Sequence, residues 1–175
     1  MRTIEPILVL AIRDAIVCSS DTPSVPYLPH PMDVCRLVLA AGGSQISACA
    51  AVLHEVVASG RLHLSSVEQR YGQAVAERVQ LLCRQVAEDE KGLLLLCADR
   101  VAELVRWGHK ASAESLASEL NALHLRMRLL SPCARQVLAR QLESLVQPVV
   151  PRPRRTRART PRALPKVPGV RQQAG

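Results

Sequence analysis

Residues 44–59 read SQISACAAVLHEVVAS, and apolar side chains fall on nearly every side of a helix drawn through this stretch. A helix on a protein surface carries one apolar stripe, whereas a segment that is apolar all round is typical of a helix inside a core. The stretch therefore predicts a central buried helix. His54 and Glu55 lie within it, and burying such groups is costly unless they have partners.

Segments with helical periodicity continue on both sides, and none shows the sustained alternation of a strand. A stretch with four prolines, 19–31, predicts a loop, and Ser65 and Glu68 have the spacing of a capping box. We expect helices at 4–18, 31–41, 44–59, 65–72, 73–87, 91–107, 112–125 and 132–146. The fold class that follows is all-α, a single helical bundle of about seven or eight helices.

The chain has 175 residues, which is enough for one domain with a substantial core. Apolar residues make up 48% and aromatic residues 2%, with no Phe, so the core must be aliphatic. The six cysteines are scattered singly, and most lie among apolar neighbours, where Cys behaves as a small hydrophobe. The start of the chain has too short an apolar run for a signal peptide or membrane span, and we expect a cytoplasmic protein.

The formal charge of +8 is concentrated at one end of the chain. Residues 1–149 hold fifteen basic and fifteen acidic residues, whereas 150–175 hold eight basic residues and no acid. We expect a folded domain at 1–147 and a disordered Pro/Arg-rich tail at 148–175. The basic positions between Arg152 and Arg171 could bind the phosphates of nucleic acid or another polyanion, or could only keep the protein soluble.

Three residues are candidate metal ligands: His54, Glu55 and, on a second apolar helix, Asp99. Imidazole and carboxylate groups together suit Mn²⁺, Fe²⁺ or Zn²⁺, and such an ion can activate a bound water. The alternative is that Asp99 pairs with Arg100 or another Arg while Glu55 faces water. His30, between two prolines, is interpreted as a structural hydrogen-bonding residue.

Four short motifs in order resemble the HD-domain hydrolase of the RelA/SpoT family, which removes the 3′-diphosphate from the alarmone (p)ppGpp in the stringent response. The matching stretches are PYLPHP at 26–31, AAVLHE at 50–55, YGQAV at 71–75 and ADRV at 98–101. The match covers roughly 15–104. The resemblance implies an HD-domain fold with Mn²⁺ at His54, Glu55 and Asp99.

The same comparison implies that several functional groups are lost. The family's early His ligand falls near Ile16, and no His precedes His30. The Glu-Asp pair that helps to activate water aligns with Ala58 and Ser59. Losing a general base typically slows a reaction by about 10²- to 10⁴-fold.

Two functions follow from this resemblance. The first is a catalytically impaired HD protein that acts as a regulatory module, binding (p)ppGpp, a related nucleotide or a protein partner. The second is an active Mn²⁺-dependent phosphohydrolase, in which a carboxylate such as Asp21 takes over a lost role. A nucleic-acid-binding adaptor that uses the basic tail is a third, weaker alternative.

Overall fold

The structure is a computed structural model that describes residues 6–20 and 29–146 of the chain. Within these ranges it contains α-helices and one short 3₁₀ helix but no strand, so the predicted all-α class is confirmed. The predicted tail, 148–175, lies outside the described residues. The helices are α1 (Pro6–Ser20), α2 (Pro29–Ala40), α3 (Gln45–Ala58), α4 (Leu64–Tyr71), α5 (Gln73–Cys83), α6 (Glu90–Trp107), η1 (Gly108–Lys110), α7 (Ala113–Met127) and α8 (Pro132–Val146).

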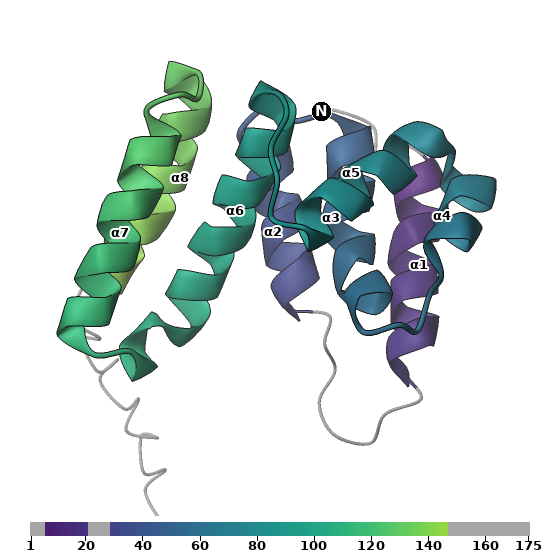
Figure 1. Cartoon of the computed structure of the whole chain (residues 1–175), viewed down its shortest axis with the longest axis horizontal. Coiled ribbons are helices and arrows are strands. Elements are labelled where there is room, and N and C mark those ends of the chain that lie inside the picture. The colour runs from purple at the N-terminus through teal and green to yellow at the C-terminus, as the bar shows by residue number, and fades with distance from the viewer. Residues whose placement is uncertain (1–5, 21–28, 147–175) are drawn as a thin grey trace, which may run out of the picture.

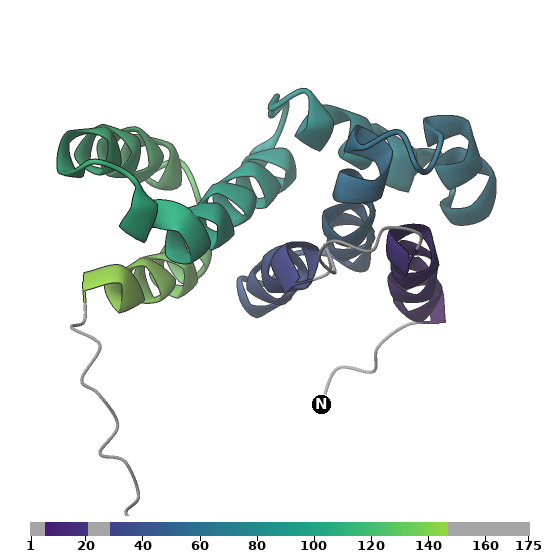
Figure 2. The same ribbon diagram turned by 90° about the horizontal axis from the view of Figure 1, so that it is seen from below.

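Helix α3 lies at the centre of the N-terminal part of the bundle, as its apolar sequence predicts. It packs against α1, α2 and α5, while α6 packs against α2 on one side and α8 on the other. The pair α7 and α8 forms one end of the molecule, and α1 and α4 form the opposite end (Figures 1 and 2). The consecutive helices α2 and α3 therefore meet α6, which comes much later in the chain, in the middle.

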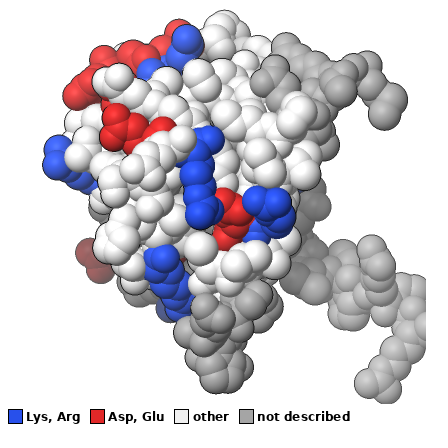
Figure 3. All heavy atoms as spheres, turned by 90° about the vertical axis from the view of Figure 1, so that its right-hand side faces the viewer, with Lys and Arg blue, Asp and Glu red and all other residues white. Residues whose placement is uncertain are grey.

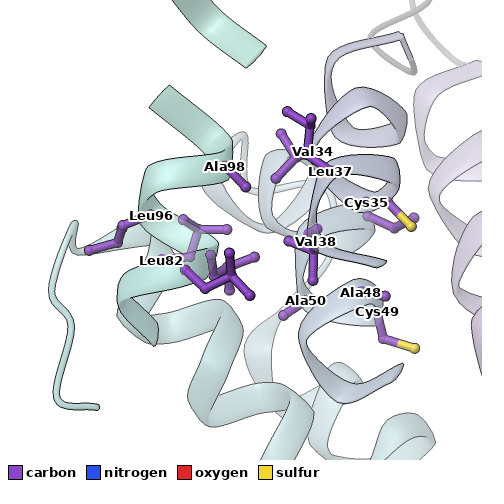
Figure 4. Packing of buried hydrophobic residues seen from close by; sticks show 14 of the residues in the cluster. Val34, Cys35, Leu37, Val38, Ala48, Cys49, Ala50, Leu82, Leu96 and Ala98 are labelled. Carbon is purple, nitrogen blue, oxygen red and sulfur yellow. The ribbon is translucent and has the colours of Figure 1, made fainter. Parts of the chain in front are cut away.

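The core between these helices is aliphatic. Side chains of α2, α3, α5 and α6 point toward one another there (Figure 4). Val38, Leu53 and Val79 are fully closed off from solvent, as are the smaller Ala50 and Ala98. Packing of this kind fixes where each helix lies, and so fixes the position of any polar side chain that the same helices carry.

Several helix boundaries differ from those expected. Helix α4 begins at Leu64, with His63 at the N-cap and no side-chain cap hydrogen bond, so the predicted capping box at Ser65 is wrong. Helix α5 ends at Cys83 instead of near residue 87. Helix α2 begins at Pro29, inside the stretch expected to be loop. Proline is tolerated in a first helical turn because its missing N–H would have no partner there.

The cysteine interpretation is only partly right. All six cysteines are free thiols. Cys35, Cys49 and Cys97 are buried in the core as predicted, but Cys83 and Cys133 are exposed.

A polar group centred on Asp14 joins α1 to α4 at one end of the bundle. The Asp14 carboxylate, 7% exposed, accepts hydrogen bonds from the Tyr71 hydroxyl and from an Arg70 guanidinium nitrogen, each at 2.7 Å. Arg13 adds a contact at 3.2 Å. This buried acid therefore has both a hydroxyl donor and cations beside it.

The surface of the described residues shows no dominant charge on the side where α1 and α4 lie. Basic and acidic groups are interspersed among uncharged atoms on that face (Figure 3). This agrees with the balanced charge of residues 1–149. No described helix is both long enough and apolar enough to cross a membrane.

Candidate metal centre

His54 lies on the side of the central helix α3 that faces α2 and α6, and it is only 7% exposed. Its Nδ1 atom is 2.7 Å from the carbonyl oxygen of Ala51, one turn earlier in the same helix. A carbonyl can only accept, so Nδ1 donates this hydrogen bond, and in the neutral imidazole the lone pair is then on Nε2. A histidine fixed in this tautomer presents Nε2 as a ligand atom, which is the common arrangement at metal sites.

His30 reaches the same place from the first turn of α2. Its Nε2 atom is 3.0 Å from Oδ1 of Asp99, and its ring centroid is 5.8 Å from that of His54, with the planes at 71°. Its other ring nitrogen, Nδ1, is buried without a hydrogen-bond partner in the described structure. His30 does form a hydrogen bond, but with a functional candidate rather than with the loop. The interpretation of His30 as structural therefore missed a member of the site.

Asp99 projects from α6 into this group and is 8% exposed. The alternative that it pairs with a neighbouring arginine is wrong, because Arg100 instead pairs with Glu103 and Glu119. Asp99 Oδ1 lies 3.0 Å from Nε2 of His30 and 3.4 Å from Nε2 of His54. No arginine or lysine pairs with Asp99 in the described part of the chain.

The two histidines and the aspartate form one compact donor set. One ligand atom from each of His30, His54 and Asp99 lies within 4.8 Å of the other two. Two imidazole nitrogens and one carboxylate oxygen are a donor set that suits Zn²⁺, Mn²⁺ or Fe²⁺. The residues therefore fit a divalent metal, and such an ion would polarise a bound water or phosphate oxygen there.

Charge in the group acts on its titratable members in opposite directions. Burial lowers the pKa of His30, but the hydrogen bond and charge of Asp99 together raise it by more than burial lowers it. The net shift is therefore upward. Burial raises the pKa of Asp99, but His30 and His54 lower it more, so the net shift is downward. Both shifts show a carboxylate and imidazoles close enough to stabilise charge on one another.

Glu55 lies at the edge of this group. Its Oε1 atom is 3.6 Å from Nε2 of His54 and 3.9 Å from Nε2 of His30, and its side chain is 26% exposed. The structure thus brings all three sequence candidates, His54, Glu55 and Asp99, to one place. Glu55 is positioned to be a fourth ligand or to contact a bound water.

A surface pocket of about 300 Å³ adjoins Glu55 at the end of α3. Val56, Ala58, Ser59 and Arg61 line the rest of it. Ala58 and Ser59 are the positions where the resemblance places the water-activating acids. Neither side chain can act as a general base at neutral pH, and among the described residues Glu55 is the one carboxylate that lines this pocket.

The position near Ile16, where the sequence comparison places an early His ligand, is not part of the site. Ile16 lies on α1 and is 44% exposed. A second imidazole is nevertheless present, because His30 supplies it. The sequence signal that could have identified His30 as a site residue was the proline on either side of it. A helix that starts at Pro29 places His30 in its first turn.

The three remaining histidines, His63, His109 and His124, are exposed as expected, at α4's N-cap, in η1 and on α7. Asp21, the proposed substitute carboxylate, lies outside the described residues. In comparisons with known proteins, no protein-family model and no curated protein matches this chain.

Proposed function

We propose that this protein binds one divalent metal ion through His30, His54 and Asp99 and acts as a regulatory module that binds a nucleotide or a protein partner. In this proposal it is a degenerate HD-domain protein resembling (p)ppGpp hydrolases of the RelA/SpoT type. The observation that carries the proposal is the convergence of three ligand atoms from α2, α3 and α6 within 4.8 Å.

Burial makes this convergence informative. Ionised carboxylates inside proteins need a cation or several hydrogen-bond donors. Asp99 has two imidazoles beside it, and a second carboxylate, Glu55, lies 3.6 Å from His54 Nε2. A divalent cation bound by Nε2 of both rings would neutralise both acids together, which suits this arrangement better than a structural ion pair.

We propose impaired catalysis because of the residues that line the pocket beside Glu55. Its lining residues Ala58 and Ser59 cannot take a proton from an attacking water. A metal alone can lower the pKa of a bound water, so weak hydrolysis is compatible with this site. The absence of the general base is expected to cost about 10²- to 10⁴-fold in rate.

The alternative, an active Mn²⁺-dependent phosphohydrolase acting on (p)ppGpp or a related nucleotide, gains support from one observation. His30 supplies a second imidazole, so the ligand set is more complete than the sequence comparison implied. The carboxylate of Glu55 would then have to serve as the base.

The test begins with metal content. Purified protein is incubated with Mn²⁺ or Zn²⁺, desalted and analysed by mass spectrometry, beside His54→Ala and the exposed control His124→Ala. We expect about one equivalent of metal in wild type and in His124→Ala, and less than a tenth of that in His54→Ala. Equal metal in all three proteins would contradict the proposal.

The same proteins loaded with Mn²⁺ are then incubated with ppGpp, and released pyrophosphate is measured. No release above that of His54→Ala supports the regulatory module. Rapid release that disappears in His54→Ala supports the hydrolase instead. Binding to a polyanion with and without 150–175, measured over a range of salt concentrations, tests the role of the tail.

A further inference from the structure

The chain turns sharply at the C-terminal end of α3, close to the candidate metal centre. Gly60 has a φ of 73°, and its backbone N–H donates to the Val57 carbonyl at 2.9 Å. The backbone N–H of the next residue, Arg61, donates to the Val56 carbonyl, also at 2.9 Å. Helices commonly end with these two bonds around one left-handed glycine, which has no Cβ to oppose that backbone. The turn therefore fixes where the backbone of Arg61 lies relative to α3.

Arg61 lines the same pocket as Glu55. The pocket has a volume of about 300 Å³, and Val56, Ala58 and Ser59 complete its lining. Arg61 is the one cationic residue in this lining. Its side chain forms no hydrogen bond or ion pair with another residue of the described ranges. The pocket thus contains a guanidinium that no acid of the described chain neutralises.

The acid in this pocket is directed to the metal centre instead of the arginine. Glu55 Oε1 lies 3.6 Å from Nε2 of His54 and 3.9 Å from Nε2 of His30. Glu55 and Arg61 do not pair, although both line the pocket. The pocket therefore has the candidate metal centre on its Glu55 side and an unpaired cation elsewhere in its lining.

We infer that this pocket binds a phosphate group of the ligand, with Arg61 as the residue that holds it beside the metal ion. The inference rests on the proposed metal binding. A guanidinium presents N–H donors in a planar fork that matches phosphate oxygens, and it remains charged at any ordinary pH. A divalent ion polarises phosphoryl oxygens too. A phosphate has oxygens for both partners, whereas a carboxylate has only two.

The size of the pocket agrees with a phosphate group better than with a whole nucleotide. Sites for small molecules have volumes of about 300–1,000 Å³, so this pocket, at about 300 Å³, is at the lower limit. It accommodates free phosphate or the phosphate end of a larger ligand. These two sources share one chemistry, and the probes below distinguish them.

Glu55 makes phosphate binding dependent on the metal. Without an ion, its carboxylate lines the same pocket as the anion, and placing like charges together costs several kcal/mol. A bound divalent ion offsets this charge. We therefore expect the Mn²⁺-loaded protein to bind phosphate at least about 10-fold more tightly than the protein in EDTA.

The test measures phosphate affinity by calorimetry in wild type, Arg61→Ala, Arg61→Lys and a control, Arg140→Ala, which is an exposed change on α8. Mass spectrometry first establishes the Mn²⁺ content of each protein. We expect about 10- to 100-fold weaker binding of inorganic phosphate in Arg61→Ala, because bonds to a charged group are lost. Arg61→Lys keeps the charge but not the fork, so its affinity should be intermediate. Arg140→Ala should match wild type.

Other probes identify the source of the phosphate. Pyrophosphate and GDP are compared with inorganic phosphate, and acetate is the carboxylate control. Binding of GDP much tighter than that of inorganic phosphate supports the phosphate end of a nucleotide, whereas equal binding supports free phosphate. Broadening of the ³¹P signal by Mn²⁺ gives a second readout, because it requires the phosphorus to lie close to the ion.

The outcomes distinguish this inference from the proposed metal binding. If wild type binds no metal, both are overturned. If wild type binds metal but no phosphate, or if Arg61→Ala binds phosphate as tightly as wild type, the inference is overturned while metal binding stands. Equal affinity for acetate and phosphate would also overturn it. A lower Tm in Arg61→Ala with unchanged phosphate affinity would make Arg61 only a structural residue.

Discussion

Among the described residues, two aspartates are nearly buried, and their surroundings are very different. Asp14 on α1 is 7% exposed and Asp99 on α6 is 8% exposed. Asp14 accepts from the Tyr71 hydroxyl and from arginine, so donors and cations of the protein itself satisfy its charge. Asp99 shares one oxygen, Oδ1, with two imidazoles.

This difference separates a structural acid from a candidate ligand. The partners of Asp14 connect α1 to α4, and within the described residues Asp14 belongs to no cluster of three or more metal-ligating side chains. The groups around Asp99 are themselves ligands, and their atoms lie within 4.8 Å of one another. Burial and polarity alone do not identify a metal site. The chemical type of the partners does.

The largest expected effect tests this contrast directly by making the same change at both acids. Asp99→Asn should weaken Mn²⁺ and Zn²⁺ binding more than about 100-fold, since losing a ligand costs more than losing a group behind one. Asp14→Asn should leave affinity within about threefold. Calorimetry on both variants, with circular dichroism to confirm folding, makes the measurement. Equal losses at the two positions would remove the distinction.

The second-largest expected effect is a loss of stability when Asp14 is substituted. Asp14→Ala leaves the Tyr71 hydroxyl, on a residue 7% exposed, without its acceptor. Hydrogen bonds to charged groups contribute about 1.5–3 kcal/mol, so we expect a loss of about 2 kcal/mol in the free energy of unfolding. Tyr71→Phe should cost less, because Arg70 still contacts the acid. Urea unfolding of both variants in EDTA checks this, and a loss below about 0.5 kcal/mol for Asp14→Ala would contradict it.

The sequence predicts the helical elements well because apolar periodicity reports directly on burial. Helix α8 has the boundaries expected, and α3 is central as its composition requires. The end of α5 was misplaced because Val86 continues the apolar pattern, although in the structure it is 44% exposed beyond a left-handed residue. Conformations of single residues leave no periodic signal.

The candidate metal centre was also predictable only in part, because some of its residues leave no periodic signal in the sequence. His54 and Asp99 stand out as polar residues in apolar helices, so burial made them candidates. His30 lies in a proline-rich stretch, and apolar periodicity does not show that a helix begins there. The pairing of Asp14 with Tyr71 likewise depends on which turns meet in three dimensions, because 57 positions separate the two residues.

The smallest expected effect concerns acid and again uses Asp14. Burial raises the pKa of Asp14, but hydrogen bonds from Tyr71 and Arg70 lower it more, leaving it below the ordinary 3.8. A carboxyl with a lowered folded-state pKa stabilises the fold at pH above 3.8, and this contribution is lost as the pH falls through the folded-state pKa. Asp14→Asn cannot titrate, so its stability should fall less steeply between pH 5 and pH 2.

The measurement is the urea midpoint of the protein in EDTA across that range, with Glu143→Gln, an exposed change on α8, as the charge-matched control. Part of the slope should remain in Asp14→Asn, because the bond from Arg78 lowers the pKa of Asp89 to about 2. A slope unchanged from wild type would mean that Asp14 has the same pKa in the folded and the unfolded protein. Its hydrogen bonds would then favour the ionised acid no more than the neutral one, and the contrast with Asp99 would rest on geometry alone.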